Sequence, residues 1–377
     1  MAYQLLLLSA VRAMGGQAVL NGVMMRGEKS YAVAVRRMDD SIDVSIKDVP
    51  SFAQKFSKIP FLRGVMGLGE SMAIGYRALM HSADLSLKDE EAKLKEEEAE
   101  KESLKRIQLN EEEGAVKSDD IAKLSEEDLA APDSDESDED KVLGKFAVGM
   151  SVTFSLVFFV SLFILSPVLA SKWIENALDL NHWQSFTVES VLRLVIFLGY
   201  LSLVSLIPDI KRVFQYHGAE HKAIAAYENN VVLTPESAQQ FSTAHVRCGT
   251  NFLLIVMVMS IVFYAGIAAF IPGVPLWGLL LSRVLVIPLI AGVSYEIIKG
   301  AATRMDNKFI RVAIRPGLWL QKITTRPPTD EQCEVAIVSL KSVFTPDQIE
   351  EVSARSISKA PKSWQTVEIP AKKPVAA

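Results

Sequence analysis

Cysteine is scarce in this sequence. The two cysteines, Cys248 and Cys333, lie far apart in the chain, which excludes the disulfide framework of small secreted domains. We therefore expect reduced thiols on the cytoplasmic side of a membrane. The N-terminal residues "MAYQLLLLSA" contain only a short apolar run with no basic residue before it, so they predict neither a signal peptide nor a membrane span. Internal spans would then direct the chain to its membrane.

Charge is missing from long stretches between about residues 146 and 299. Four apolar runs there are long enough to cross a bilayer, which takes about 20 residues; they are roughly 147–170, 187–207, 252–271 and 276–298. The first and third runs contain no charged residue. The second contains Glu189 and Arg193 and the fourth Arg283 and Glu296, so these two are also compatible with buried helices of a soluble core. The fold class predicted is a mainly α integral membrane protein with about four transmembrane helices.

One segment is strongly acidic and the rest of the chain is basic. Residues 84–141 contain 23 acidic and 9 basic residues, a net charge of −14, while the remainder is net +9. The first half of this insertion has the pattern of a solvated helix and the second half that of a disordered segment. It is a solubilising spacer or a docking site for a cytosolic protein partner.

The chain divides into four predicted parts. Residues 1–83 carry a glycine-rich β element, with a hairpin formed by "YAVAVRR" and "SIDVSIKDV", and a helix at 59–82 that lies on the membrane surface or forms a fifth span. Residues 84–141 are the acidic insertion. Residues 142–300 form the four-span membrane domain, which includes a His-rich segment at 208–251, and residues 301–377 are a cytoplasmic C-terminal segment with a short helix and a tail.

Basic residues predict the orientation of the spans. Lys and Arg gather between the second and third spans and after the fourth, while the other two connections hold few charges. The positive-inside rule then places both termini and residues 208–251 in the cytoplasm, in a multi-pass protein of the cell inner membrane. The bilayer is the expected partner, a homo-oligomer is possible on this pattern, and nucleic acid is not expected because the rule already explains the basic residues.

The segment "GGQAVLNGVMMRG" at 15–27 is rich in glycine but lacks the residues of a phosphate loop. It contains no Gly-Lys-Ser/Thr and no dinucleotide fingerprint. Its Gln17, Asn21 and Arg26 could approach a polar site, or its glycines could simply form tight turns.

The strongest chemical signal is "YHGAEHK" at 216–222. Four-residue spacing on a helix places His217 and His221 on one face, a spacing that a single metal ion can accept from two histidines. The pattern His-x-x-Glu-His is also the inverted zinc-protease motif, in which the glutamate, here Glu220, activates water. The alternative is that both histidines only pack and form hydrogen bonds.

Other candidates share the same membrane face. His245 and Cys248 lie three apart before the third span; Cys248 is a candidate ligand or, less simply, a nucleophile. Glu296 follows His221 by about the separation at which inverted zinc proteases place their third ligand, although an ion pair with Arg283 or Lys299 would also explain it. The residues that could hold a phosphate or carboxylate of a substrate are Arg26, Arg247 and Arg304.

Six ordered motifs resemble the YqhQ-like family, which contains domain of unknown function 1385. They are "GGQAVLNGVMMRG", "PFLRG", "YHGAEHKAIAAYE", "HVRCGTNF", "AGVSYEIIK" and "PGLWLQKITTRPP". The resemblance implies a bacterial or plastid membrane protein of unknown function, described as a predicted metal-dependent enzyme. Carried over by motif, it implies the ligands His217, His221, His245 and Cys248, with Glu220 and Glu296 as acid–base groups or further ligands.

Three classes of function fit these observations. The first is a metal-dependent membrane enzyme, in which a divalent ion, most simply Zn²⁺, serves hydrolysis of a lipid-linked or membrane-peptide bond. The second is a non-catalytic membrane scaffold or assembly factor that recruits a partner through residues 84–141. The third is a small transporter whose pathway would be lined by Glu189, Arg193, Arg283 and Glu296.

Overall fold

The protein divides into two compact units in a computed structural model. Unit 1 comprises Met1–Ser86 and Phe197–Ala377, and unit 2 comprises Leu87–Ile196. The residues that the structure describes are 14–50, 52–112, 150–151, 153–246, 248–270, 275–302, 304 and 307–353. The predicted disorder of the second half of the acidic insertion falls outside these residues.

Unit 1 contains a four-stranded antiparallel sheet near the start of the chain. Its strands are β1 (Gly15–Val19), β2 (Gly22–Arg26), β3 (Ser30–Arg36) and β4 (Ile42–Asp48), in the order β1-β2-β3-β4. The predicted hairpin is present as β3 and β4. The glycine-rich segment before it, which we expected to form turns, adds β1 and β2, joined by a two-residue turn in which Asn21 has φ 52°.

Helices cover both faces of this sheet. On one face, Val23, Met25, Ala32 and Ala34 pack against α6 (Pro208–Glu228) and α12 (Asp330–Lys341). On the other face, Met24, Tyr31, Val33 and Val35 pack against α2 (Leu62–Glu112). The run "YAVAV" in β3 is therefore apolar throughout, because a strand buried on both faces does not alternate.

Helix α2 is longer than the sequence predicted. It has 51 residues and continues from the expected surface helix into the acidic insertion without a break, passing from unit 1 into unit 2. Its residues Ile74, Ala78 and Leu85 are buried against the sheet; full burial of a side chain such as Ile74 contributes about 1.5–3 kcal/mol. The apolar spacing that suggested a membrane surface thus serves packing on the sheet, and α2 is not among the candidate spans found in the described residues.

Three helices in the described residues are long and apolar enough to cross a membrane. They are Thr153–Leu178, Trp183–Val204 and Gly249–Ile267, and a bent pair, Trp277–Leu285 with Ile287–Ala301, makes a fourth if it is one span. Only 17% of the most apolar window is buried in each of the three. Apolar surface exposed on this scale indicates contact with lipid, which supports membrane association and agrees with the predicted spans.

Prolines explain the irregular geometry of two of these spans. In the first, a π-helical turn, η3 (Ser161–Leu165), precedes Pro167 near the start of α4 (Ser166–Leu178). In the bent pair, Pro288 lies one residue into α10 (Ile287–Ala302), after a 40° bend from α9 (Leu276–Leu285). Proline has no N–H to donate to the preceding turn, so both helices deform where it occurs.

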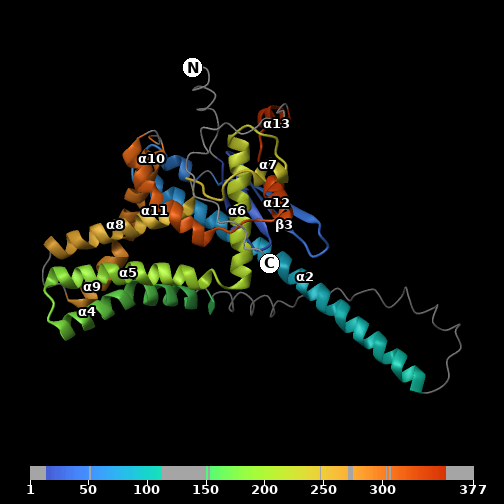
Figure 1. The fold of residues 1–377 in the computed structure, drawn as a ribbon, viewed down its shortest axis with the longest axis horizontal. Coiled ribbons are helices and arrows are strands. Elements are labelled where there is room, and N and C mark those ends of the chain that lie inside the picture. Colours follow the sequence, from blue (N-terminus) through green and yellow to red (C-terminus); the bar gives the residue numbers. More distant parts are fainter. Residues whose placement is uncertain are drawn as a thin grey trace, which may run out of the picture. The chain divides into compact units, whose positions relative to one another are not determined.

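Within unit 1, α12 and α7 lie beside α6 (Figure 1). The predicted C-terminal helix is confirmed as α12, which begins with a capping box between Thr329 and Gln332. Helix α11 (Lys308–Thr324) was not predicted; it lies beside α8 (Gly249–Phe270). The other helical elements are α5 (His182–Val204), α7 (Pro235–Gln239), α13 (Pro346–Ser353) and the 3-10 turn η1 (Ala53–Phe56).

Candidate metal centre

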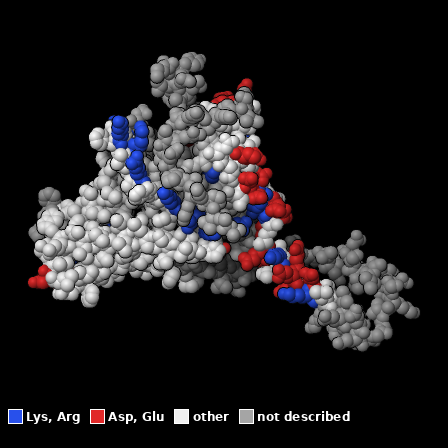
Figure 2. All heavy atoms as spheres, viewed as in Figure 1, with Lys and Arg blue, Asp and Glu red and all other residues white. Residues whose placement is uncertain are grey.

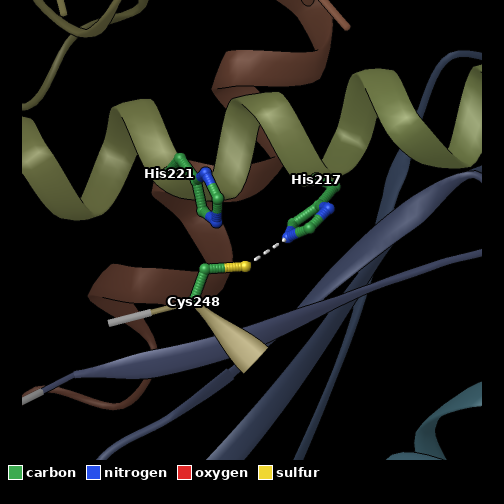
Figure 3. A group of neighbouring side chains, drawn as sticks. All are labelled: His217, His221 and Cys248. Atoms are coloured by element: carbon green, nitrogen blue, oxygen red, sulfur yellow. Dashed lines mark hydrogen bonds between the residues drawn. The ribbon is translucent and has the colours of Figure 1, made fainter. Parts of the chain in front are cut away.

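Helix α6 presents the two histidines of "YHGAEHK" on one face. Pro208 in the first turn and Asp209 beside it favour the start of this helix. His217 and His221 are one helical turn apart, and their ring centroids are 4.5 Å apart. Both rings point from α6 toward Cys248, which precedes α8 (Figure 3). The predicted arrangement of the histidine pair is therefore present.

Gly218 allows a second segment of chain to reach these histidines. A Cβ at this position would overlap the carbonyl oxygen of Arg326, whose amide donates to the Phe214 carbonyl at 2.8 Å. This close approach brings the Thr324 carbonyl oxygen to 2.8 Å from His217 Nδ1. Only glycine permits two backbones to lie this close.

Each imidazole is oriented by a backbone carbonyl. His217 Nδ1 contacts the Thr324 oxygen, and His221 Nδ1 contacts the Thr243 oxygen. Because a carbonyl can only accept, Nδ1 carries the hydrogen in both rings and Nε2 has its lone pair available. Such carbonyl contacts are how proteins orient histidines that bind metals.

Cys248 supplies a third donor atom. Its Sγ lies 3.2 Å from His217 Nε2, and the Thr250 amide donates to it at 3.4 Å from the first turn of α8. Burial raises the pKa of the Cys248 thiol, but the nearby His221 ring and hydrogen bonds from Thr250 outweigh burial, so the pKa of Cys248 is lowered. One donor atom from each of His217, His221 and Cys248 lies within 4.8 Å of the other two.

The three donors line a cavity of about 380 Å³ that also contains Glu220. The Gly16 amide donates to the Glu220 carboxylate, and a Cβ at Gly16 would lie 2.9 Å from that side chain. Glu220 Oε2 and His221 Nε2 are both buried and have no hydrogen-bond partner among the described residues. Burial raises the pKa of Glu220 to about 8. A buried carboxyl oxygen and a buried imidazole nitrogen that both lack a partner suit a cation or a water bound in the cavity.

His245 lines the cavity but is turned to a different partner. Its Nε2 lies 3.3 Å from a carboxylate oxygen of Glu228, and its ring centroid is 5.6 Å from that of His221. Burial lowers the pKa of His245 to about 4, so the neutral ring donates to Glu228 at pH 7. Gln321 on α11 holds the backbone of His245 through its side-chain amide. His245 therefore borders the three converging donors without being one of them.

Glu296 is not brought to the cluster. Its carboxylate accepts two hydrogen bonds from the Arg63 guanidinium, one of them from Nε at 2.7 Å, and a third from the Phe61 amide at 3.3 Å. A two-pronged pair of this kind fixes both groups. The motif "PFLRG" is thereby joined to "AGVSYEIIK", and the separation of Glu296 from His221 reflects this packing.

Replacing Glu296 by glutamine is therefore expected to leave metal binding unchanged and to lower thermal stability. The amide cannot accept two charge-assisted bonds from Arg63. The measurement is metal content together with the melting temperature of the purified variant, with Arg63→Lys as the companion change. Loss of bound metal from Glu296→Gln at unchanged stability would instead make Glu296 a ligand.

The predicted substrate arginines do not border the cavity in the described residues. Arg26 is paired with Glu70 and contacts Ser71 Oγ at 3.4 Å. Arg304 is exposed, and its guanidinium contacts the Gly300 carbonyl at 3.4 Å; Arg247 lies outside the described residues. Gln17, by contrast, does line the cavity.

The charged residues considered for a transport pathway each contact another side chain of the described helices. Glu189 and Arg193 form a buried pair at 2.7 Å on α5. The Arg283 guanidinium lies 4.1 Å from the centre of the Tyr264 ring. The first contact lies within α5, and the second joins α9 to α8.

The fold and site define a helical, membrane-associated protein with a His-His-Cys cluster at the start of a candidate span. The family described as "Protein of unknown function (DUF1385)" matches residues 59–346, and the chain belongs to it. A relative is "Uncharacterized protein YqhQ" of Bacillus subtilis (strain 168), which is 34% identical over 343 residues, covering 90% of this chain and 94% of that protein. No solved structure matches.

Proposed function

We propose that this protein is a metal-dependent hydrolase at the cytoplasmic face of the cell inner membrane. In this proposal His217, His221 and Cys248 bind one divalent ion, most simply Zn²⁺. The observation that carries it is the convergence of three donor atoms within 4.8 Å, one of them the buried and unpartnered His221 Nε2. The distribution of Lys and Arg along the sequence supports the cytoplasmic side.

The donor set fits zinc in kind and in number. Imidazole nitrogen and thiolate sulfur are ligands that zinc prefers, and catalytic zinc sites use three protein ligands and leave a fourth position open. Tetrahedral donors lie about 3.5 Å apart at normal zinc bond lengths, and His217 Nε2 and Cys248 Sγ are already 3.2 Å apart. The open position would face the cavity, because the cavity is lined by all three residues.

Glu220 is placed to move a proton at this centre. Its backbone lies between the two histidines on α6, and one carboxylate oxygen, Oε2, has no partner among the described residues. The Gly16 amide holds the carboxylate in place. A bound zinc ion would polarise the scissile bond and make water nucleophilic at neutral pH, and Glu220 would accept and return the proton.

The other walls of the cavity favour an apolar substrate. Met14, Val213, Phe214 and Ile224 border it, and Cys248 immediately precedes the candidate span Gly249–Ile267. A lipid-linked compound or a membrane peptide would reach this position from the bilayer. We therefore place the scissile bond in a substrate of that kind.

The test measures hydrolysis by wild type and by Glu220→Gln in mixed micelles. The substrates are a panel of fluorogenic membrane peptides, lipid-linked esters and lipid-linked phosphodiesters. We expect wild type to hydrolyse one class and Glu220→Gln to lower kcat/KM by about 10²- to 10⁴-fold, the usual contribution of an acid–base group. The variant should keep its metal.

Glu236→Gln is the matched control, because Glu236 lies on α7 outside the cavity, and its rate should equal that of wild type. Equal rates for Glu220→Gln and wild type would remove Glu220 from the mechanism. If metal-loaded wild type turns over no class, the hydrolase proposal fails and a scaffold role leads.

A further inference from the structure

Helix α11 has one face packed on the protein and a broad exposed face. Its buried residues are Gly317, Leu318, Leu320, Gln321 and Thr324. On the exposed side, Phe309 is 86% exposed, Val312 57% and Trp319 69%. Large side chains exposed to this extent on one helix mark an interaction surface.

The exposed face consists of two parallel stripes. The apolar stripe is formed by Phe309, Val312, Pro316 and Trp319, and the basic stripe beside it by Lys308, Arg311, Arg315 and Lys322. Members of each stripe follow one another at helical spacing, mostly three or four residues apart, so each stripe runs along the helix. Figure 2 shows Lys and Arg gathered over the region of α10 and α11.

Packing against α8 attaches α11 to one end of a candidate span. Gly317 lies so close to Asn251 that a Cβ would overlap its side-chain oxygen, and Gln321 Nε2 donates to the same oxygen at 3.1 Å. Asn251 is in the first turn of α8, where the candidate span Gly249–Ile267 begins. Helix α11 is therefore attached to the first turn of a candidate span.

We propose that α11 is an interfacial helix that binds anionic phospholipid. The stripe from Phe309 to Trp319 enters the outer acyl region, and the four basic side chains contact headgroup phosphates. Apolar and basic stripes side by side on one exposed face are typical of helices that lie in the plane of the interface, and basic groups at this level attract anionic lipid.

A second copy of the chain fits this surface less well. A symmetric pair of α11 helices would place two basic stripes near each other, and like charges in contact oppose association. Anionic lipid complements both stripes at once. The inference does not depend on a metal ion or on hydrolysis.

The test uses the full chain reconstituted in vesicles of phosphatidylcholine and a smaller share of phosphatidylglycerol. Only the phosphatidylglycerol carries bromine, on its acyl chains near the headgroup. Bromine quenches tryptophan at short range, and the difference between wild type and Trp319→Phe isolates the signal of Trp319. We expect Trp319 to be quenched, and the quenching to fall at least twofold in Arg311→Glu/Arg315→Glu. Quenching of Trp319 in wild type should also fall when the bromine is carried by phosphatidylcholine and not by phosphatidylglycerol.

Two control variants separate lipid binding from misfolding. Lys29→Glu/Lys47→Glu carries the same charge change on exposed residues of the bend before β3 and of β4 and should quench like wild type, as should Arg311→Lys/Arg315→Lys. Trp319 unquenched in wild type, or quenched equally in Arg311→Glu/Arg315→Glu, would overturn the proposal. Trp319 shielded in a crosslinked pair of chains would overturn it in favour of a second copy.

Discussion

His221→Ala is expected to lower the zinc that copurifies with the protein at least tenfold, from about one equivalent in wild type. Even outer-sphere partners of a metal site change affinity by about 10- to 100-fold, and His221 would be a direct ligand with its Nδ1 already held by the Thr243 carbonyl. His217→Ala and Cys248→Ala should behave alike. The measurement is plasma mass spectrometry of protein purified in detergent.

His81→Ala is the matched control for histidine removal. His81 lies on α2, and its Nε2 is 3.5 Å from Asp43, outside the cavity, so this variant should keep one equivalent. Absence of metal from folded wild type would leave the cluster as thiol–imidazole hydrogen bonding and would remove the basis of the hydrolase proposal.

Alkylation of cysteine tests metal ligation by Cys248 independently of metal content. A chelator should expose Cys248 to iodoacetamide, and added zinc should protect it. Cys333 serves as an internal control, because it is fully buried and burial raises its pKa to about 11. Reaction of Cys248 at one rate with and without chelator would contradict metal ligation by its sulfur.

Gly218→Ala is expected to destabilise the protein by about 1–3 kcal/mol, the usual cost of forcing a methyl group into a packed position. Alanine favours a helix over glycine by about 1 kcal/mol, but here the added Cβ would overlap the Arg326 carbonyl. The displaced chain would also withdraw the Thr324 carbonyl from His217, so metal occupancy should fall with stability. The measurements are the midpoint of thermal unfolding and the metal content.

Gly67→Ala is the control that separates the effect of this contact on stability from the effect of helix propensity. Gly67 lies in α2, and a Cβ there would meet no atom within 4 Å. This substitution should leave stability unchanged or raise it by up to about 1 kcal/mol. Equal effects of the two substitutions would show that the approach of the 324–326 segment does not depend on Gly218.

Local patterns in the sequence were sufficient to predict the candidate spans and the arrangement of the histidine pair. Apolar runs of about 20 residues have few structures open to them, and the structure has candidate spans at three of the four predicted places and a bent helix pair at the fourth. The spacing of His217 and His221 needs only the helical period. Each of these predictions depends on residues near one another in the chain.

Predictions that depended on distant contacts were less complete. The sequence offered His245, Cys248 and Glu296 as further ligands, and only packing shows that Cys248 converges with the pair while Arg63 holds Glu296. The carbonyls of Thr243 and Thr324 carry no signal in their side chains. Gly218 was the available clue, since a glycine inside a helix between two histidines indicates close approach of another backbone.

The discontinuity of unit 1 has a consequence for biosynthesis. The sheet at residues 15–48 is covered on one face by α12, at residues 330–341, so that face lacks part of its cover until the chain is nearly complete. At a synthesis rate of about 5–20 residues per second, the wait is roughly 15–60 s. During that time the ribosome-bound chain exposes apolar strands, and a stop codon before α12 would leave one face of the sheet without this helix.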